Sequence, residues 1–124
     1  MKLKDDFFSV IETSPDKKDY LVSLNPRHEI YSDHFPGNPV TPGVCIIQMI
    51  KELASLYTGR KLFMRHASKI RYFKVINPTE HERINVSLDI VPGENECRVA
   101  ATVSSNDDTF ARLSLDFGYT VVIR

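Results

Sequence analysis

The sequence predicts an α+β fold in which one long helix is held against an antiparallel sheet. Residues 44–57 repeat apolar side chains at the helical period, whereas the second half of the chain alternates apolar and polar residues with a period of two. Turn-forming residues separate these alternating runs, and no internal repeat interrupts the 124 residues. A chain of this length can build one modest core but not two, so we expect a single domain over residues 1–124.

Six runs are typical of strands: residues 7–12, 19–24, 67–76, 84–90, 97–103 and 110–117. The last three follow one another through turn-rich segments and should form a meander. Their alternation slips once, between Phe110 and Leu113, which suggests a bulge. The run over 67–76 is β-branched and aromatic, and Asn77-Pro78 would end it.

The helix is expected from about Pro42 to Thr58. Thr41 is suited to be its N-cap, Pro42 fits the first helical position, and Gly59 can end it as a left-handed cap. Apolar residues follow two neighbouring rows, so the apolar stripe is wide. The polar positions are few: Gln48, Lys51, Glu52 and Ser55. Such a helix needs to be mostly enclosed, and the sheet is the only large apolar surface available to wrap it.

Charge and composition exclude several classes of protein. Sixteen Lys and Arg balance sixteen Asp and Glu, so the chain lacks the basic excess of proteins that bind nucleic acids or anionic membranes. Acidic residues follow Met1 closely and no run is apolar enough to span a membrane, which favours a cytoplasmic protein.

Cys45 and Cys97 lie in apolar surroundings and are expected to be buried free thiols. No metal site is expected, because C-x-x-C and H-x-x-x-H spacings are absent.

The net charge of zero conceals a basic segment of the chain. Between Leu53 and Thr79 there is no Asp or Glu, and six residues are basic: Arg60, Lys61, Arg65, Lys69, Arg71 and Lys74. This local excess could attract an acidic partner, such as an acyl carrier protein or the phosphate of its arm. A solvated strand and loop explain the same residues equally well.

Residues 32–43 are the most unusual in composition. Three prolines and two glycines stiffen the backbone from Pro36 to Gly43, His34 stands just before them, and the loop leads into a helix N-terminus. The first turn of a helix presents unbonded N–H groups and the positive end of the helix dipole, which can hold an oxygen that develops negative charge. Gly43 would leave room for that oxygen. The pattern therefore favours a histidine acid or base facing a bound carbonyl group.

The run from His34 to Val44 resembles the H-F-P-G-x-P-x-x-P-G-x signature of the hotdog-fold 3-hydroxyacyl-acyl-carrier-protein dehydratases of fatty-acid synthesis. Residues 69–78 are similar to the strand that follows the helix in that family, and the likeness extends over roughly residues 9–117. It implies a hotdog fold, in which a curved antiparallel sheet wraps a long helix and two subunits pair edge to edge. Active sites in this family lie at the dimer interface.

The resemblance also implies a reaction and its residues. His34 matches the catalytic histidine, and the backbone N–H of Gly43 is expected to polarise the thioester carbonyl. The surrounding side chains would line the substrate site: Phe35, Pro36, Pro42 and Val44. A 3-hydroxyacyl chain, carried on the phosphopantetheine of acyl carrier protein or coenzyme A, would lose water to give the trans-2-enoyl thioester, in fatty-acid or related lipid or polyene synthesis. No further cofactor is implied.

One position departs from the family pattern. The second catalytic residue of the family is a carboxylate fourteen residues after the histidine, and Gln48 stands there in this chain. An amide has no titratable proton near neutral pH, so Gln48 cannot act as a general acid. The chain is therefore either a weakened dehydratase, or a non-catalytic or heterodimeric subunit that binds acyl thioesters, with an acyl thioesterase as a third reading. Gln48 itself is equally well explained as a surface residue of the helix.

Overall fold

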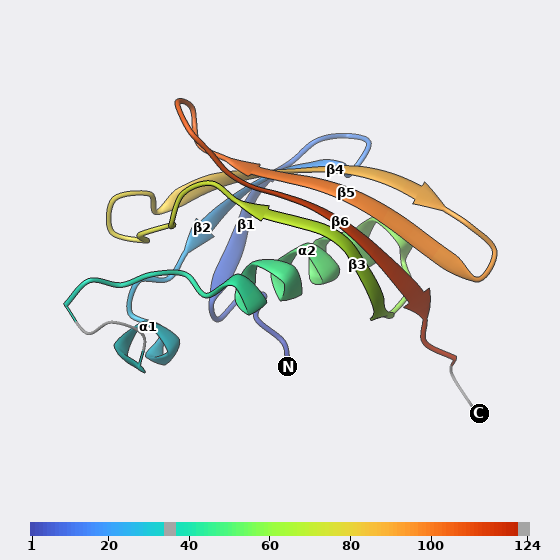
Figure 1. Ribbon diagram of the computed structural model, residues 1–124, viewed down its shortest axis with the longest axis horizontal. Helices are drawn as coiled ribbons and strands as arrows, with labels where there is room; N and C mark the ends of the chain where they lie inside the picture. Colours follow the sequence, from blue (N-terminus) through green and yellow to red (C-terminus); the bar gives the residue numbers. More distant parts are fainter. Residues whose placement is uncertain (34–36, 122–124) are drawn as a thin grey trace.

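The computed structural model describes residues 1–33 and 37–121, apart from the side chain of Asp33. Within them the chain forms β1 (Phe8–Thr13), β2 (Asp19–Leu24), α1 (Glu29–Asp33), α2 (Gly43–Thr58), β3 (Leu62–Tyr72), β4 (Arg83–Pro92), β5 (Glu96–Ser104) and β6 (Thr109–Tyr119). The strands form one antiparallel sheet in the order β1-β2-β4-β5-β6-β3, and α2 lies against one of its faces (Figure 1). The predicted arrangement of helix and sheet is confirmed.

The meander of β4, β5 and β6 follows the predicted alternation. Inward-facing residues of these strands are buried and their neighbours are exposed, because one face of the sheet packs on α2 and the other meets solvent. Val103 pairs with Ala111 and Ser104 pairs with Thr109, so Phe110 is the extra residue of a bulge. The predicted slip is confirmed. Further register shifts occur in β1 and β3, and bulges of this kind bend a sheet around what it covers.

The core joins α2 to the inner face of the sheet. Six helix residues are buried at the helical period: Cys45, Ile46, Met49, Ile50, Leu53 and Ala54. They meet the inward residues of the strands, among them Val86, Val103 and Phe117, each with no exposed surface. Both cysteines are free and buried, as predicted, and burial raises the pKa of each thiol. No helix in the described ranges is long and apolar enough to cross a membrane.

The strand predicted over residues 67–76 is wrong at both ends. β3 begins at Leu62 and ends at Tyr72, because the N–H groups of Phe73 and Lys74 both turn to the carbonyl oxygen of Phe110. Residues 73–76 then leave the sheet and cross toward the start of α2. β3 is the last strand of the sheet, and most of its residues are exposed on both faces, which removes the period-two signal.

The predicted N-cap is also wrong. Pro42, with an extended backbone, is the capping residue, and its carbonyl oxygen accepts the first helical hydrogen bonds from Cys45 and Ile46. Thr41 does not cap the helix because its side chain is buried and its hydroxyl group lies 2.9 Å from that of Tyr31. At the other end Gly59 adopts the left-handed conformation (φ 67°) and donates to Ser55, as predicted.

The short helix α1 was not predicted. Its first turn is closed by His28, whose Nδ1 accepts the N–H of Ile30 (3.1 Å) while Nε2 faces the carboxylate of Asp6 (3.1 Å). Five residues are too few to show a helical period, and histidine is not among the usual capping residues. α1 lies beside the chain that leads to α2 (Figure 1), and its Tyr31 is buried in the core.

Candidate functional site

The first turn of α2 opens onto a hollow of about 340 Å³. Residues 40–43 line one side of it, and residues 72–76 line the other, with Ile46 between them. Among the residues that the structure describes, no acceptor meets the N–H groups of Gly43 and Val44. Two unbonded N–H groups at the positive end of a helix dipole are suited to hold an oxygen that carries negative charge. The hollow therefore has N–H groups that could hold such an oxygen, and the predicted role of Gly43 stays a prediction.

Tyr72 occupies the space that Gly43 leaves. A Cβ atom added to Gly43 would lie 2.6 Å from the phenol oxygen of Tyr72 and 2.9 Å from Cζ, closer than real contacts allow. With Tyr72 in this position a side chain at residue 43 would clash with the phenol, and the room expected for a substrate oxygen is in part filled by this hydroxyl. Partial burial raises the pKa of Tyr72 above its ordinary value. Sequence reasoning missed Tyr72, because nothing in a strand end signals contact with a distant glycine.

A buried hydrogen bond holds the loop in front of α2. The hydroxyl groups of Tyr31 and Thr41 lie 2.9 Å apart, and both residues are almost fully buried. Phe7 stacks on the ring of Tyr31 at 5.2 Å between centroids. Burial raises the pKa of Tyr31 to about 12, although the hydrogen bond to Thr41 acts in the opposite direction. Tyr31 is thus a rigid anchor for the chain that enters α2.

Alkaline pH is expected to destabilise the protein through Tyr31. Its pKa rises from an ordinary 10.0 to about 12 in the folded state, so the neutral phenol is the form that folding favours. The stabilisation is complete below pH 10.0 and is lost as pH rises toward about 12. Urea unfolding at a series of pH values measures this loss. Tyr31→Phe should cost about 1 kcal/mol at neutral pH and reduce the loss at high pH, and an unchanged alkaline loss would contradict this role.

Three of the predicted site residues, His34, Phe35 and Pro36, lie outside the described residues. The structure places the other two predicted substrate-binding residues at the helix start. Pro42 lines the hollow, whereas Val44 points away from the core and is 68% exposed. An exposed valine beside unbonded N–H groups is a surface that another molecule can cover.

Gln48 does not share this hollow. Its Nε2 donates to the carbonyl oxygen of Met1 (2.7 Å) and to Oε2 of Glu52 (2.9 Å). It lines a separate hollow of about 740 Å³ between the N-terminal segment, α2 and the start of β3. In one protomer, the structure therefore does not bring Gly43 and Gln48 together. Sequence reasoning missed the hydrogen bond between Gln48 and Glu52. The available signal was their spacing of four residues, which places both on one helix face.

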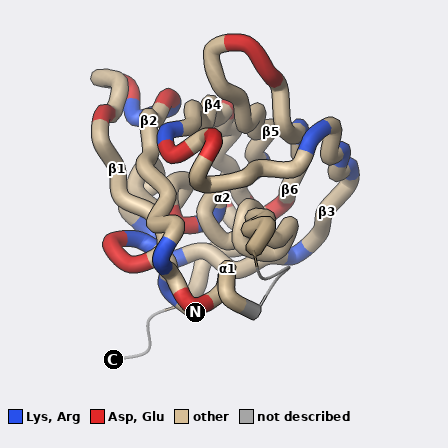
Figure 2. Tube along the Cα trace, turned by 90° about the vertical axis from the view of Figure 1, so that its left-hand side faces the viewer, with Lys and Arg blue, Asp and Glu red and all other residues tan. Residues whose placement is uncertain are grey.

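The six basic residues do not form one patch. Arg60 and Lys61 line the same hollow as Gln48, and the guanidinium of Arg60 stacks on Tyr119 at 3.8 Å. Arg65 points elsewhere and faces the carboxylate of Glu96 at 3.6 Å. Figure 2 shows basic positions (blue) at intervals along β3, at one side of the molecule.

The remaining three basic residues lie near the end of β3. Lys69 and Arg71 line a hollow of about 270 Å³ on the outer face of the sheet, opposite Arg112 of β6. Lys74 leaves the sheet and pairs with Asp108, whose pKa this ammonium lowers. The basic segment thus contains two cationic regions, Arg60 with Lys61 and Lys69 with Arg71. The charges of Arg65 and Lys74 are paired with carboxylates.

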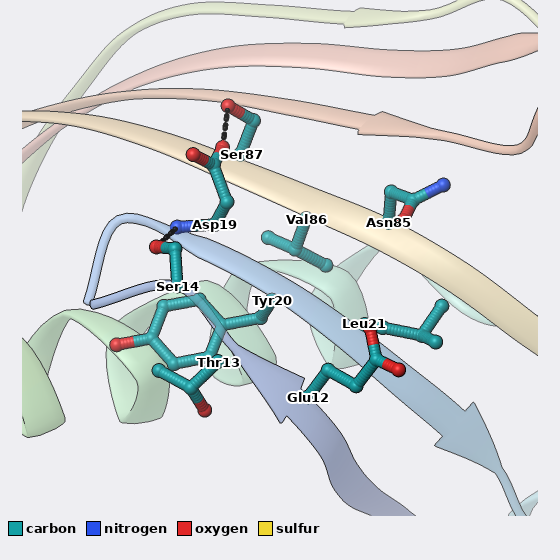
Figure 3. Close-up of a pocket in the computed structure, with 9 residues that line it drawn as sticks. All are labelled: Glu12, Thr13, Ser14, Asp19, Tyr20, Leu21, Asn85, Val86 and Ser87. Carbon is teal, nitrogen blue, oxygen red and sulfur yellow. Dashed lines mark hydrogen bonds between the residues drawn. The ribbon is translucent and has the colours of Figure 1, made fainter. Parts of the chain in front are cut away.

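A further hollow, of about 410 Å³, crosses β1, β2 and β4 (Figure 3). Three of its polar residues bond one another: the hydroxyl of Ser87 donates to Asp19 (2.6 Å), and the N–H of Asp19 donates to the hydroxyl of Ser14 (2.9 Å). It shares no lining residue with the hollow at α2. We therefore assign the candidate site to the start of α2.

Comparisons with known proteins identify the family to which the chain belongs. The sequence model of one family, ApeI-like, described as ApeI dehydratase, matches residues 11–112. A 3-hydroxyacyl-[acyl-carrier-protein] dehydratase FabZ from Lactobacillus helveticus is 31% identical over 75 residues, which are 55% of this chain and 49% of that protein. The chain spans about half the length of the curated relatives it matches.

Solved structures with low sequence identity share the fold. The dehydratase heterocomplex ApeI:P from Xenorhabdus doucetiae has a TM-score of 0.68 at 14% identity, covering 88% of this chain and 96% of that one. A hypothetical thioesterase protein with coenzyme A from Streptococcus pneumoniae has a TM-score of 0.63 at 12% identity, covering 91% and 85%. The hotdog fold implied by the sequence motif is thereby confirmed, and the chain belongs to the ApeI-like dehydratase family.

Proposed function

We propose that this protein is a 3-hydroxyacyl thioester dehydratase subunit whose reaction centre is the start of α2. The pair of unbonded N–H groups on Gly43 and Val44, at the end of the motif that begins at His34, carries this proposal. The thioester carbonyl oxygen would accept from the N–H of Gly43, and an enolate developing there would be stabilised by the helix dipole. The acyl group would arrive on the phosphopantetheine of acyl carrier protein or coenzyme A, and no cofactor of the protein is needed.

In the proposed reaction, His34 removes a proton from C2 of the substrate. The electron pair of that C–H bond becomes the C2–C3 double bond as the C3–O bond breaks, and the departing hydroxide takes a proton to become water. A carboxylic acid would supply that proton, and Gln48 has none to give. The loss of one acid–base group typically costs about 10² to 10⁴ in rate, so we expect slow turnover by the isolated chain.

A second protomer is proposed to complete the site. β3 is the last strand of the sheet, and within the described residues it pairs only with β6. Exposed apolar side chains follow it toward the hollow at α2: Phe63, Met64, Ile70, Tyr72, Phe73 and Val75. Burying such a patch favours association. The separation of Gly43 and Gln48 within one protomer is consistent with a site built from Gly43 of one subunit and position 48 of another.

A heterodimer is the alternative that a specific observation favours. Gln48 removes the proton donor, and the similar ApeI:P structure is described as a dehydratase heterocomplex. In that arrangement this chain would contribute His34 and the start of α2, and a related subunit would contribute the carboxylate. The isolated chain would then bind acyl thioesters without turning them over.

The acyl carrier is proposed to approach one of the two cationic regions. Lys69, Arg71 and Arg112 have no anionic partner among the described residues, and the hollow they line shares Phe73 with the hollow at α2. Arg60 and Lys61 form the other region, beside Gln48. Acidic groups of the carrier, or the phosphate of its arm, would complement either one.

His34→Ala is expected to abolish the interconversion of 3-hydroxybutyryl and crotonyl thioesters, because His34 is the residue proposed to take the C2 proton. Absorbance of the enoyl thioester follows the reaction in both directions. His81→Ala, which removes a histidine packed on Phe110 at 5.0 Å, is the matched control. Equal turnover by His34→Ala and the wild type would overturn the role of His34. Release of free thiol from acyl thioesters would instead indicate a thioesterase.

A further inference from the structure

We infer that Glu52 is a positioning residue that fixes which end of the Gln48 amide faces the thioester site. This inference rests on the proposed function, because it assigns position 48 to that site. Nε2 of Gln48 has two neighbours at hydrogen-bond distance, the carbonyl oxygen of Met1 (2.7 Å) and Oε2 of Glu52 (2.9 Å). Both neighbours are oxygen acceptors.

The chemistry of those neighbours allows one orientation of the amide. A side-chain amide has a donor end and an acceptor end of nearly equal size, so its orientation is decided by what surrounds it. Turning the group over would set Oε1 against a carbonyl oxygen and a carboxylate oxygen, with repulsion in place of two hydrogen bonds. Oε1 is therefore the only polar atom of Gln48 left to meet a substrate or a second subunit.

Glu52 is itself held in place by the N-terminal segment. Its Oε1 accepts from the N–H of Leu3 (3.0 Å) and of Lys4 (2.8 Å), and its Oε2 also lies 2.9 Å from the N–H of Leu3. Leu3 is 2% exposed and belongs to the core cluster. The carboxylate is thus fixed by groups that only donate, and it has no freedom to swing away from Gln48.

A chemical consequence follows for the reacting partner. With Oε1 outward, Gln48 accepts hydrogen bonds and does not donate them to the site. An ionised carboxylate also only accepts hydrogen bonds. The amide can therefore accept a hydrogen bond at this position, as the family carboxylate would, but it cannot deliver a proton. The group that meets Gln48 must therefore carry a proton, as the 3-hydroxyl of a 3-hydroxyacyl chain does.

The orientation can be measured without any assay of activity. Gln48 is the only glutamine in the chain, so labelling with ¹⁵N-glutamine gives one side-chain amide to observe by NMR. We expect its two protons to be well separated in shift and slow to exchange in the wild type. Glu52→Ala should move them toward the values of free glutamine and speed their exchange, whereas the exposed Glu80→Ala should leave them unchanged.

Signals of Gln48 that are the same in Glu52→Ala and the wild type would overturn the inference. If Glu52→Ala does not fold, Glu52→Gln replaces it, since that side chain keeps its size and loses one acceptor oxygen. It should shift the Gln48 protons in the same direction by a smaller amount, and no shift would equally overturn the inference.

Turnover separates this inference from the proposed function. If the wild type interconverts the thioesters, Glu52→Ala should lower kcat by roughly tenfold or more with little change in KM, because the amide is misplaced and the binding groups are not. An unchanged kcat would contradict the positioning role while leaving the dehydratase intact. If the wild type shows no turnover, the dehydratase proposal fails by itself, and the NMR result still decides the orientation of Gln48.

Discussion

Gln48→Glu is expected to raise the rate of dehydration by about 10² to 10⁴, the range typical of one general acid–base group. The amide accepts hydrogen bonds but cannot deliver a proton to the departing hydroxide. A carboxyl of the same length would occupy the same place on α2 and add the missing proton. Initial rates of hydration of a crotonyl thioester, measured for both proteins at equal concentration, test this expectation.

The surroundings of position 48 should supply that proton near neutral pH. The introduced carboxyl would lie where Nε2 now sits, 2.9 Å from Oε2 of Glu52 and 2.7 Å from the carbonyl oxygen of Met1. Two carboxylates this close do not both ionise easily, so the pair should share one proton and the pKa of one member should rise. Gln48→Glu should therefore stay active at pH values at which an ordinary glutamate has already lost its proton.

The double variant Gln48→Glu with Glu52→Gln is the matched control. It keeps the new carboxyl and removes the neighbouring charge, so the alkaline limb of its pH–rate profile, where the general acid loses its proton, should move to lower pH. No rate gain in Gln48→Glu, in a protein that remains folded by circular dichroism, would show that position 48 does not meet the leaving hydroxyl. The heterodimeric alternative would then account better for the chain.

The parts of this fold that were predictable are those in which one face is buried and the other is solvated. β4, β5 and β6 are such strands, and even the bulge at Phe110 is visible as a slip in their alternation. β3 lies at the sheet edge with both faces largely exposed, so its boundaries had no pattern to mark them. The short helix α1 is shorter than the window that shows a helical period.

The candidate site was predictable as a motif and not as a geometry. The stiff loop and the helix start follow from Pro and Gly at fixed positions. The partners of those residues come from elsewhere in the chain: Tyr72 reaches Gly43, Tyr31 takes the hydroxyl of Thr41, and Met1 receives the amide of Gln48. Contacts between residues distant in sequence are set by the tertiary packing, which no local pattern records.

Gly43→Ala is expected to displace Tyr72 and to lower turnover at least tenfold. The added methyl group would lie 2.6 Å from the phenol oxygen and 2.9 Å from Cζ, so the ring must move out of the hollow. Overpacking of this kind costs roughly 1 to 3 kcal/mol, and the half-exposed ring of Tyr72 can move aside to relieve it. The net loss of stability should therefore be small, while the geometry of the hollow changes.

A double-mutant cycle with Tyr72→Ala isolates this contact. Without the phenol ring the methyl group meets no side chain of residue 72, so Gly43→Ala should be neutral or stabilising in that background. The two changes should then couple by about 1 to 3 kcal/mol in the free energy of unfolding, measured with urea. An equal cost of Gly43→Ala in both backgrounds would mean that the clash is not with Tyr72. A further outcome is that the two changes couple in stability while Tyr72→Ala fails to restore the turnover lost in Gly43→Ala. That result would show that the phenol itself, and not only the space it fills, belongs to the working site.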